Sequence, residues 1–204
     1  MFSEEDGALA VALARDTLDA FVIRRERKTL ELRPIFREKR GAFVTVNTHP
    51  AGELRGCIGF PSPLFPLEET LVRAAEGAAE DPRFPPLSRP ELDRVVVEVS
   101  LLTPPEELRA RKSHDLPKLV VVGRDGLVVA RGRARGVLLP QVAVDWSWDA
   151  ETFLTQVCLK AGLSPDAWLD KETILYAFRG DLFAEEAPHG RVARRDLVKP
   201  HAGG

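Results

Sequence analysis

The sequence predicts an α+β fold with largely antiparallel strand pairing. Helix and strand patterns follow one another in a mixed order, and short turns separate several of the strand patterns. A TIM-like βα alternation or a Rossmann fingerprint would indicate a parallel sheet, and neither pattern is found. The 204 residues, 44% hydrophobic and 29% charged, are enough for one large domain or two closely packed lobes.

The first half of the chain carries patterns for a helix, a strand hairpin, a second helix, an irregular segment and a further strand. The predicted ranges, in that order, are 3–28, 41–46 with 53–59, 66–80, 81–86 and 95–102. Ser3 and Asp6 have the spacing of a capping box at the start of the first helix. A turn-rich segment of Asn, Pro and Gly between the two strands predicts the hairpin.

The second half is richer in strand patterns. They predict a hairpin, a short strand, a helix, a helical turn and a last strand. Their ranges are 119–122 with 127–130, 137–140, 149–161, the surroundings of Trp168, and 173–179. The folded domain is expected to cover residues 1–186, and the glycine-containing residues 187–204 are expected to form a flexible tail.

The composition narrows the class of protein. The acidic N-terminus lacks the basic region of a secretory signal, and no apolar run reaches the length of a membrane span. A cytoplasmic protein with two free thiols is therefore expected, although a Cys57–Cys158 disulfide stays open. One asparagine, two glutamines and 16 prolines favour a thermophile, as would a GC-rich genome.

The charge balance disfavours nucleic acid binding without removing it as an alternative. The formal net charge is −2, so the chain as a whole does not attract phosphates. Basic residues nevertheless cluster in three short runs, at 24–28, 131–135 and 191–195. Such runs are more often solvated faces than binding sites.

The candidate functional site is the segment Leu54-Arg55-Gly56-Cys57-Ile58-Gly59. Strand alternation divides it into a core-facing set and an opposite set. The core-facing set is Leu54, Gly56 and Ile58, with Phe60, and the opposite set is Arg55, Cys57 and Gly59. A cation beside a thiol favours the thiolate, and glycines permit close approach of a ligand or partner.

These features leave several interpretations open. Cys57 could be a reactive thiol, part of an anion-binding or docking surface, or an inert half-buried side chain. Arg55 could contact Glu98 across the sheet, and a dyad of Cys57 with His49 across the hairpin is a further alternative. The four histidines have no ligand spacing with one another or with the cysteines, so neither a metal site nor a cofactor is expected.

Three further segments contain candidate residues. Asp81 and Arg83 lie in the proline-rich segment and could frame a pocket or simply pair with each other. Gln141 lies in an apolar setting and would need hydrogen-bond partners if buried. Trp146 and Trp148 are two residues apart, and such aromatic residues usually serve packing.

The segment 54–59 resembles the signature hexapeptide of the AMMECR domain family. Further blocks resemble the family in the same order, and the similarity extends from about residue 2 to residue 186. These blocks are Glu80–Leu87, Val97–Pro105, Gly126-Leu127, Gly136–Ala143, and Cys158–Leu163 with Trp168. Val137 and the pair Trp146 and Trp148 depart slightly from the family pattern.

The resemblance implies two lobes that share a mixed, barrel-like sheet flanked by helices. It supplies no established reaction, but it associates the domain with a Memo-like domain and a radical-SAM protein as possible partners, and with basic information processing. The leading interpretation is a binding or accessory module, without a cofactor. Its predicted binding residues are Leu54, Arg55, Gly56, Ile58, Gly59, Asp81, Arg83, Glu98 and Gln141. An enzyme that uses Cys57 is the first alternative, and a nucleic-acid-binding protein is the second.

Overall fold

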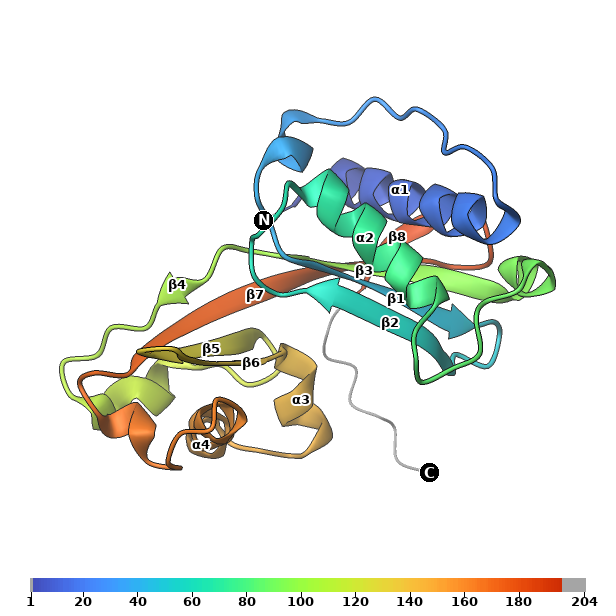
Figure 1. Cartoon of the computed structure of the whole chain (residues 1–204). Coiled ribbons are helices and arrows are strands. Elements are labelled where there is room, and N and C mark those ends of the chain that lie inside the picture. Colours follow the sequence, from blue (N-terminus) through green and yellow to red (C-terminus); the bar gives the residue numbers. More distant parts are fainter. Residues whose placement is uncertain (1, 196–204) are drawn as a thin grey trace. The chain divides into compact units, whose positions relative to one another are not determined.

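The computed structural model of the chain describes residues 2–195 (Figure 1). These residues form two compact units. The first unit contains residues 2–102 and 181–195, and the second unit contains residues 103–180. Each unit buries a hydrophobic cluster of its own.

The first unit contains two α-helices, which lie on one side of its strands (Figure 1), and two short 3₁₀ helices. They are α1 (Glu4–Ile23), α2 (Leu67–Ala79) and the short 3₁₀ helices η1 (Pro34–Arg37) and η2 (Arg89–Arg94). The predicted capping box of Ser3 and Asp6 is confirmed. The predicted end of the first helix at residue 28 is wrong. Arg24 adopts a left-handed backbone with φ of 55° and caps α1 directly after Ile23.

The strands of the first unit begin with the predicted hairpin, which is confirmed. They are β1 (Ala42–Thr48), β2 (Leu54–Phe60), β3 (Val95–Leu102), the end of β7 (Ile174–Glu185) and β8 (Val192–Arg195). β1 lies between β2 and β3 and pairs antiparallel with both, so β2 is at the edge. Alternate residues of β1 and β3, such as Val44 and Val97, are fully buried and join α1 and α2 in one core.

The predicted flexible tail is wrong for residues 187–195. β8 pairs antiparallel with β7, with Val192 opposite Glu185. Arg194 also forms ion pairs with Asp181 and with Glu4 of α1. The hydrogen bonds of this strand pair hold β8 against β7 across the short connection of residues 186–191, although that connection contains Gly190. Residues 196–204 lie outside the described part of the chain.

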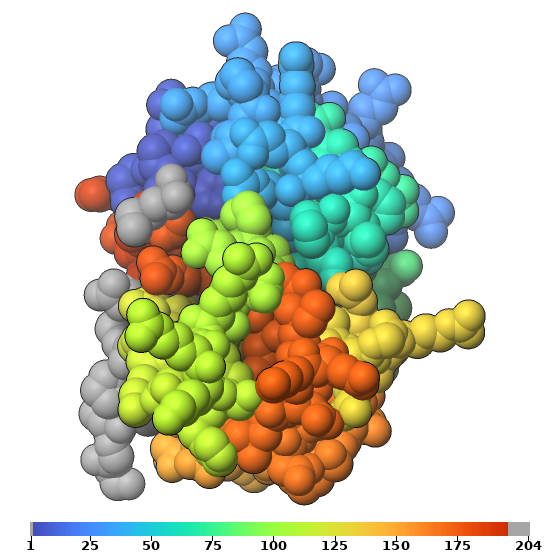
Figure 2. Space-filling model, turned by 90° about the vertical axis from the view of Figure 1, so that its left-hand side faces the viewer, coloured from blue at the N-terminus to red at the C-terminus, as the bar shows by residue number. Residues whose placement is uncertain are grey.

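The second unit combines short helices with the remaining strands. Its elements are β4 (Glu106–Glu107), η3 (Ser113–Leu119), β5 (Asp125–Arg131), β6 (Ala134–Leu138), α3 (Pro140–Asp145), α4 (Ala150–Lys160), η4 (Ala167–Leu169) and the first part of β7. β7 pairs with both β4 and β5, and β6 pairs with β5. Figure 2 shows the yellow-green segment that contains β4 beside the orange residues of β7.

The predicted hairpin of 119–122 with 127–130 is wrong. Residues 113–119 form η3, and a turn follows, in which the Val121 N–H donates to the Asp125 carboxylate at 2.9 Å. The hairpin forms one strand later, between β5 and β6, with Gly132 at its turn. The apolar run after residue 119 therefore packs without forming a ladder, because a local side-chain acceptor competes for its backbone.

The predicted α+β class, with two lobes that share a largely antiparallel sheet, is confirmed. The strands of both units belong to one sheet in the order β2-β1-β3-β7-β5-β6, because β7 runs through both units. In the part of the chain that the structure describes, no helix is both long enough and apolar enough to cross a membrane.

Candidate functional site

Two side chains form hydrogen bonds with the backbone of Cys57 at the outer edge of β2. The Cys57 N–H donates to Asp81 Oδ2 at 2.9 Å, and Arg83 Nη2 donates to the Cys57 carbonyl at 3.3 Å. Asp81 and Arg83 are joined by an ion pair of 2.6 Å. Together these side chains occupy the backbone groups that a neighbouring strand would otherwise use.

Asp81 accepts most of the hydrogen bonds in this arrangement. Its side chain is 1% exposed, and it also accepts hydrogen bonds from the Arg83 backbone N–H and Nε, each at 3.0 Å. The hydrogen bond from the Arg83 side chain, together with the backbone bonds from Cys57 and Arg83, holds the pKa of Asp81 well below its usual range, against the opposing effect of burial. The carboxylate is therefore charged at neutral pH and fixes the segment 81–83 against β2.

Acidification is expected to remove this stabilisation. Because the folded-state pKa of Asp81 is depressed, its contribution is complete above the unfolded pKa and falls as the pH drops toward the folded value. Urea unfolding of the wild-type chain should therefore show stability falling from pH 5 to pH 2. Asp81→Asn should be less stable at pH 7 and should show a shallower fall. Parallel curves for the two proteins would contradict this assignment.

Arg55 pairs with Glu91, so the predicted Arg55–Glu98 contact is wrong. Arg55 Nε donates to Glu91 Oε1 at 2.7 Å, and Nη2 donates to the second carboxylate oxygen at 3.3 Å. The guanidinium also lies 5.9 Å from the centre of the Phe84 ring, and its side chain is 13% exposed. The hydrogen bond from Arg55, reinforced by those from Ser88, lowers the pKa of Glu91 to about 2. Arg55 is thereby tied to η2.

The Cys57 thiol belongs to a polar row on the sheet face away from α2. Cys57 and Glu98 both lie opposite Thr45 in the strand register. The Thr45 hydroxyl donates to Cys57 Sγ at 3.2 Å, and Cys57 is half-buried. Burial raises the pKa of Glu98, although Arg195 opposes this effect. The row therefore combines a thiol, a hydroxyl and a carboxyl group.

The geometry supports neither the dyad of Cys57 with His49 nor the Cys57–Cys158 disulfide. His49 follows β1 four residues after Thr45, a separation of about 13 Å along an extended strand. Such a distance is too long for a hydrogen bond between His49 and Cys57. Both cysteines are free, and Cys158 is buried in the core of the second unit.

Two hexapeptide residues face α2. A Cβ atom at Gly56 would lie 2.2 Å from the Ala78 carbonyl oxygen, and a Cβ at Gly77 of α2 would lie 2.9 Å from Ile58. Gly56 and Ile58 therefore allow the helix and the strand to approach closely. On the opposite face, a Cβ at Gly59 would lie 2.3 Å from the Phe43 ring. Each of these predicted binding residues has a packing role.

Leu54 is the exposed member of the hexapeptide, with 42% of its surface accessible. Arg83 is also exposed, and Phe84 is half-buried. Gln141, the remaining predicted binding residue, is exposed on α3 in the second unit. The accessible side chains of the cluster around Arg55 and Cys57 are therefore Leu54, which precedes Arg55 in the sequence, and Arg83 and Phe84, which contact Cys57 and Arg55.

Sequence reasoning missed two residues of this cluster, Thr45 and Glu91, and gave Phe84 only as part of the candidate segment 81–84. Ser88 and Glu91 form a capping box at the start of η2, and their spacing in the sequence could have drawn attention to that carboxylate. Its contact with Arg55 spans 36 residues and leaves no local signal. Thr45 could have been found only by fixing the register of the hairpin.

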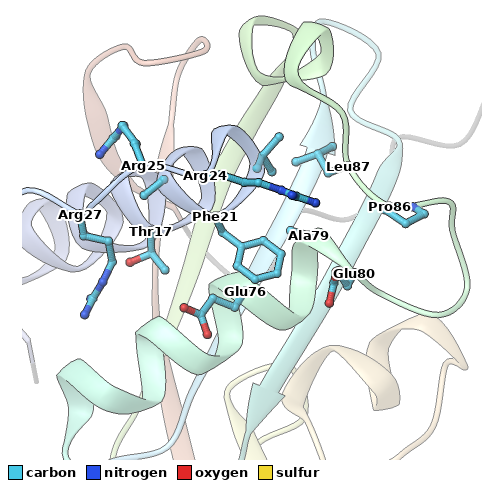
Figure 3. Close-up of a pocket in the computed structure, with 12 residues that line it drawn as sticks. Thr17, Phe21, Arg24, Arg25, Arg27, Glu76, Ala79, Glu80, Pro86 and Leu87 are labelled. Atoms are coloured by element: carbon cyan, nitrogen blue, oxygen red, sulfur yellow. The ribbon is translucent and has the colours of Figure 1, made fainter.

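A groove of about 680 Å³ adjoins the same proline-rich loop (Figure 3). Its walls come from the end of α1, the chain after it, the end of α2, and Pro86 with Leu87. Figure 3 shows Phe21 in the middle of the groove and Arg24 extending toward Leu87. The Pro86 carbonyl accepts from Arg55 at 3.4 Å, so this loop contributes to both the groove and the hexapeptide cluster.

Metal ligands are not assembled in this region. Among residues 2–195, no group of three or more His, Cys, Asp or Glu side chains is arranged to hold a metal ion. What the cluster offers chemically is a half-buried thiol with a hydroxyl donor, two arginine–carboxylate pairs and a partly apolar outer surface.

Comparison with known proteins gives a consistent result. A family model described as AMMECR1 matches residues 11–183. Protein PF1979 of Pyrococcus furiosus is 47% identical over 201 residues, which cover 96% of this chain and 95% of that protein. Protein MJ0810 of Methanocaldococcus jannaschii is 44% identical over 195 residues, which cover 95% of this chain and 97% of that protein.

A solved structure agrees in sequence and in fold. The crystal structure of the uncharacterized protein PH0010 from Pyrococcus horikoshii matches with a TM-score of 0.81 and 44% sequence identity, over 96% of this chain and 98% of that chain. Family model, relatives and solved structure therefore all cover the hexapeptide together with most of both units. On these grounds the chain belongs to the AMMECR1 family.

Proposed function

We propose that the chain is a binding or accessory module rather than a catalyst. Its recognition surface consists of Leu54, Arg55, Cys57, Arg83 and Phe84. The observation that carries the proposal is the pair of arginine–carboxylate contacts that hold the two arginines of this surface in place. Arg83 is held by Asp81, and Arg55 is held by Glu91.

Rigidity of this kind favours binding. A surface that is already ordered loses little conformational entropy when a partner docks. Pro82, Pro85 and Pro86 are exposed and restrict the loop further. Leu54 and Phe84 provide apolar area, and arginine beside apolar area is typical of the residues that dominate protein interfaces.

The partner we propose is a protein, either Memo-like or of the radical-SAM class. This choice follows from the family resemblance of the hexapeptide and of the blocks that accompany it. The module would hold such a partner without contributing a chemical step of its own. The cytoplasmic location expected from the sequence is compatible with such a partnership.

Catalysis by Cys57 is the weaker alternative. A cysteine nucleophile is normally activated by a base within hydrogen-bonding reach. The hydrogen bond recorded for the Cys57 side chain comes from Thr45, which donates to the sulfur. A hydroxyl donor orients the thiol but removes no proton from it. This environment supports recognition more directly than nucleophilic attack.

Nucleic acid binding is also less well supported. In each of the three basic runs, at least one arginine is paired with a carboxylate. Arg25 pairs with Asp16 at 2.5 Å, and the groove beside it also contains Glu76 and Glu80. Carboxylates at these positions reduce the positive potential that phosphate binding requires.

The test is a calorimetric titration of the chain with the purified Memo-like and radical-SAM proteins of the same organism. Leu54→Asp adds a charge at the exposed leucine of the recognition surface and is expected to weaken binding about tenfold or more. Leu64→Asp is the matched control, because Leu64 is 60% exposed and lies outside the recognition surface. It is expected to leave affinity unchanged.

The same titration separates recognition from catalysis. Cys57→Ser is expected to keep the affinity within about threefold, because serine preserves the size of the side chain. The proposal fails if neither protein binds the wild-type chain, or if Leu54→Asp and Leu64→Asp bind equally well. Urea unfolding of each variant confirms that any lost binding does not reflect lost folding.

A further inference from the structure

The second unit exposes an aromatic side chain that the proposed function does not use. Trp146 lies in the turn between α3 and α4 and is 69% exposed. Its ring is stacked on that of Trp148, with ring centres 6.1 Å apart and planes inclined by 17°. Exposing an indole of this size is costly in water and is more typical of binding surfaces than of ordinary turns.

The turn that carries Trp146 is well fixed. The Trp148 side chain is half-buried and packs against the hydrophobic cluster of the second unit. The Trp148 N–H donates to the Ala143 carbonyl at 2.8 Å, and the Ser147 N–H donates to the Val144 carbonyl at 3.0 Å. Trp148 therefore supports the exposed ring from behind, and Trp146 is held in place before any partner arrives.

Ser147 adopts an unusual backbone conformation between the two rings. Its φ is 53°, a left-handed value that costs a residue with a Cβ about 1–2 kcal/mol. The conformation allows the two indoles, two positions apart, to stack on the same side. Backbone strain of this kind is often retained where it orients a functional side chain.

The charged residues next to the tryptophans in the sequence all have the same sign. From Gly136 to Leu159 the chain contains no lysine, arginine or histidine. It contains three carboxylates, Asp145, Asp149 and Glu151, and all three residues are exposed. Hydrogen bonds from Thr152 lower the pKa of Asp149, so this carboxylate is charged at neutral pH.

We propose that Trp146, Asp145 and Glu151 form a second docking surface, which binds a lysine- or arginine-bearing segment of a protein partner. The face of an indole attracts a cation, and Trp is the strongest of the aromatic side chains in this respect. The neighbouring carboxylates add attraction of the same sign and speed the encounter with a basic partner. This surface lies wholly in the second unit, and its assignment is independent of the proposed function of the hexapeptide.

The experiment titrates the full chain with an amidated hexa-arginine peptide and follows tryptophan fluorescence together with the heat of binding. Trp146→Ala is expected to weaken binding about three- to tenfold. Trp146→Phe should retain part of the affinity, because phenylalanine is also a cation–π acceptor. Removing both exposed charges with Asp145→Asn and Glu151→Gln should weaken binding and reduce its salt dependence.

Ile174→Ala is the matched control, since Ile174 is a 41% exposed apolar residue of the same unit and lies outside the proposed surface. It is expected to bind like the wild-type chain. Equal affinity of the wild-type and Trp146→Ala chains would overturn the proposal. So would light scattering that finds a dimer for the wild type and a monomer for Trp146→Ala, because a second copy of the chain would then be the occupant.

Discussion

Replacing Gly56 by alanine is expected to lower the free energy of unfolding by about 3 kcal/mol or more, because overpacking against an immobile backbone atom lies at the upper end of such costs. The added Cβ would lie 2.2 Å from the Ala78 carbonyl oxygen of α2. A flexible side chain could move aside, whereas this oxygen belongs to helix backbone. The measurement is urea unfolding at equilibrium, followed by far-UV circular dichroism.

Gly132→Ala is the control for the loss of a glycine in itself. Gly132 has a φ of 57°, and an added Cβ would meet no atom within 4 Å. Its replacement should cost only the strain of a left-handed alanine, about 1–2 kcal/mol. Equal costs at the two positions would show that close contact between α2 and β2 is not what requires Gly56.

Removing the carboxylate of Glu185 is expected to destabilise the first unit by about 3–5 kcal/mol, the usual cost of leaving one member of a buried ion pair alone. Glu185 accepts from Arg15 Nε at 2.9 Å and pairs with a second guanidinium nitrogen, and it also accepts from the Val97 N–H at 2.9 Å. The two side chains are 7% and 3% exposed. Glu185→Ala would therefore leave the Val97 donor without this acceptor and would remove the hydrogen-bonded carboxylate from the buried Arg15. The arginine would keep the Leu92 and Val95 carbonyls and the more distant Asp19 carboxylate, at 3.6 Å.

The double variant Arg15→Met with Glu185→Leu tests this explanation. Buried ion pairs replaced by apolar residues of similar size often lose little stability. We therefore expect the double variant to recover a large part of the loss caused by Glu185→Ala, as measured by urea unfolding at pH 7. If the double variant were as unstable as the single one, the loss would come from the volume removed and not from the unpaired charge.

Local signals in the sequence predicted the parts of the fold that neighbours along the chain determine. The capping box of Ser3 with Asp6 and the β1–β2 hairpin depend on residues a few positions apart. The segment after residue 119 was predicted as a strand because its apolar residues are β-branched. A turn forms there instead of a strand, because the Val121 N–H donates to the Asp125 carboxylate and this local hydrogen bond outweighs strand propensity.

The candidate site, too, was predictable only where residues close together in the sequence determine it. Its location on the second strand of a hairpin followed from the residues themselves, as did the contact between Asp81 and Arg83, which are two positions apart. The partner of Arg55 did not, because Glu91 is brought close by the loop that leaves α2 and not by strand register. β8 escaped prediction for a different reason: the glycines near the C-terminus suggested a tail, although β8 pairs with β7 across the short connection of residues 186–191.

The most direct test of the account is the ratio of two dissociation constants, measured in one titration series with the Memo-like or radical-SAM partner. The ratio compares Leu54→Asp, on the recognition surface, with Leu64→Asp, an equally drastic change at another exposed leucine. We expect a ratio of about ten or more, with both variants folded. A ratio near one would contradict the central claim that the surface around Leu54–Gly59 recognises a partner.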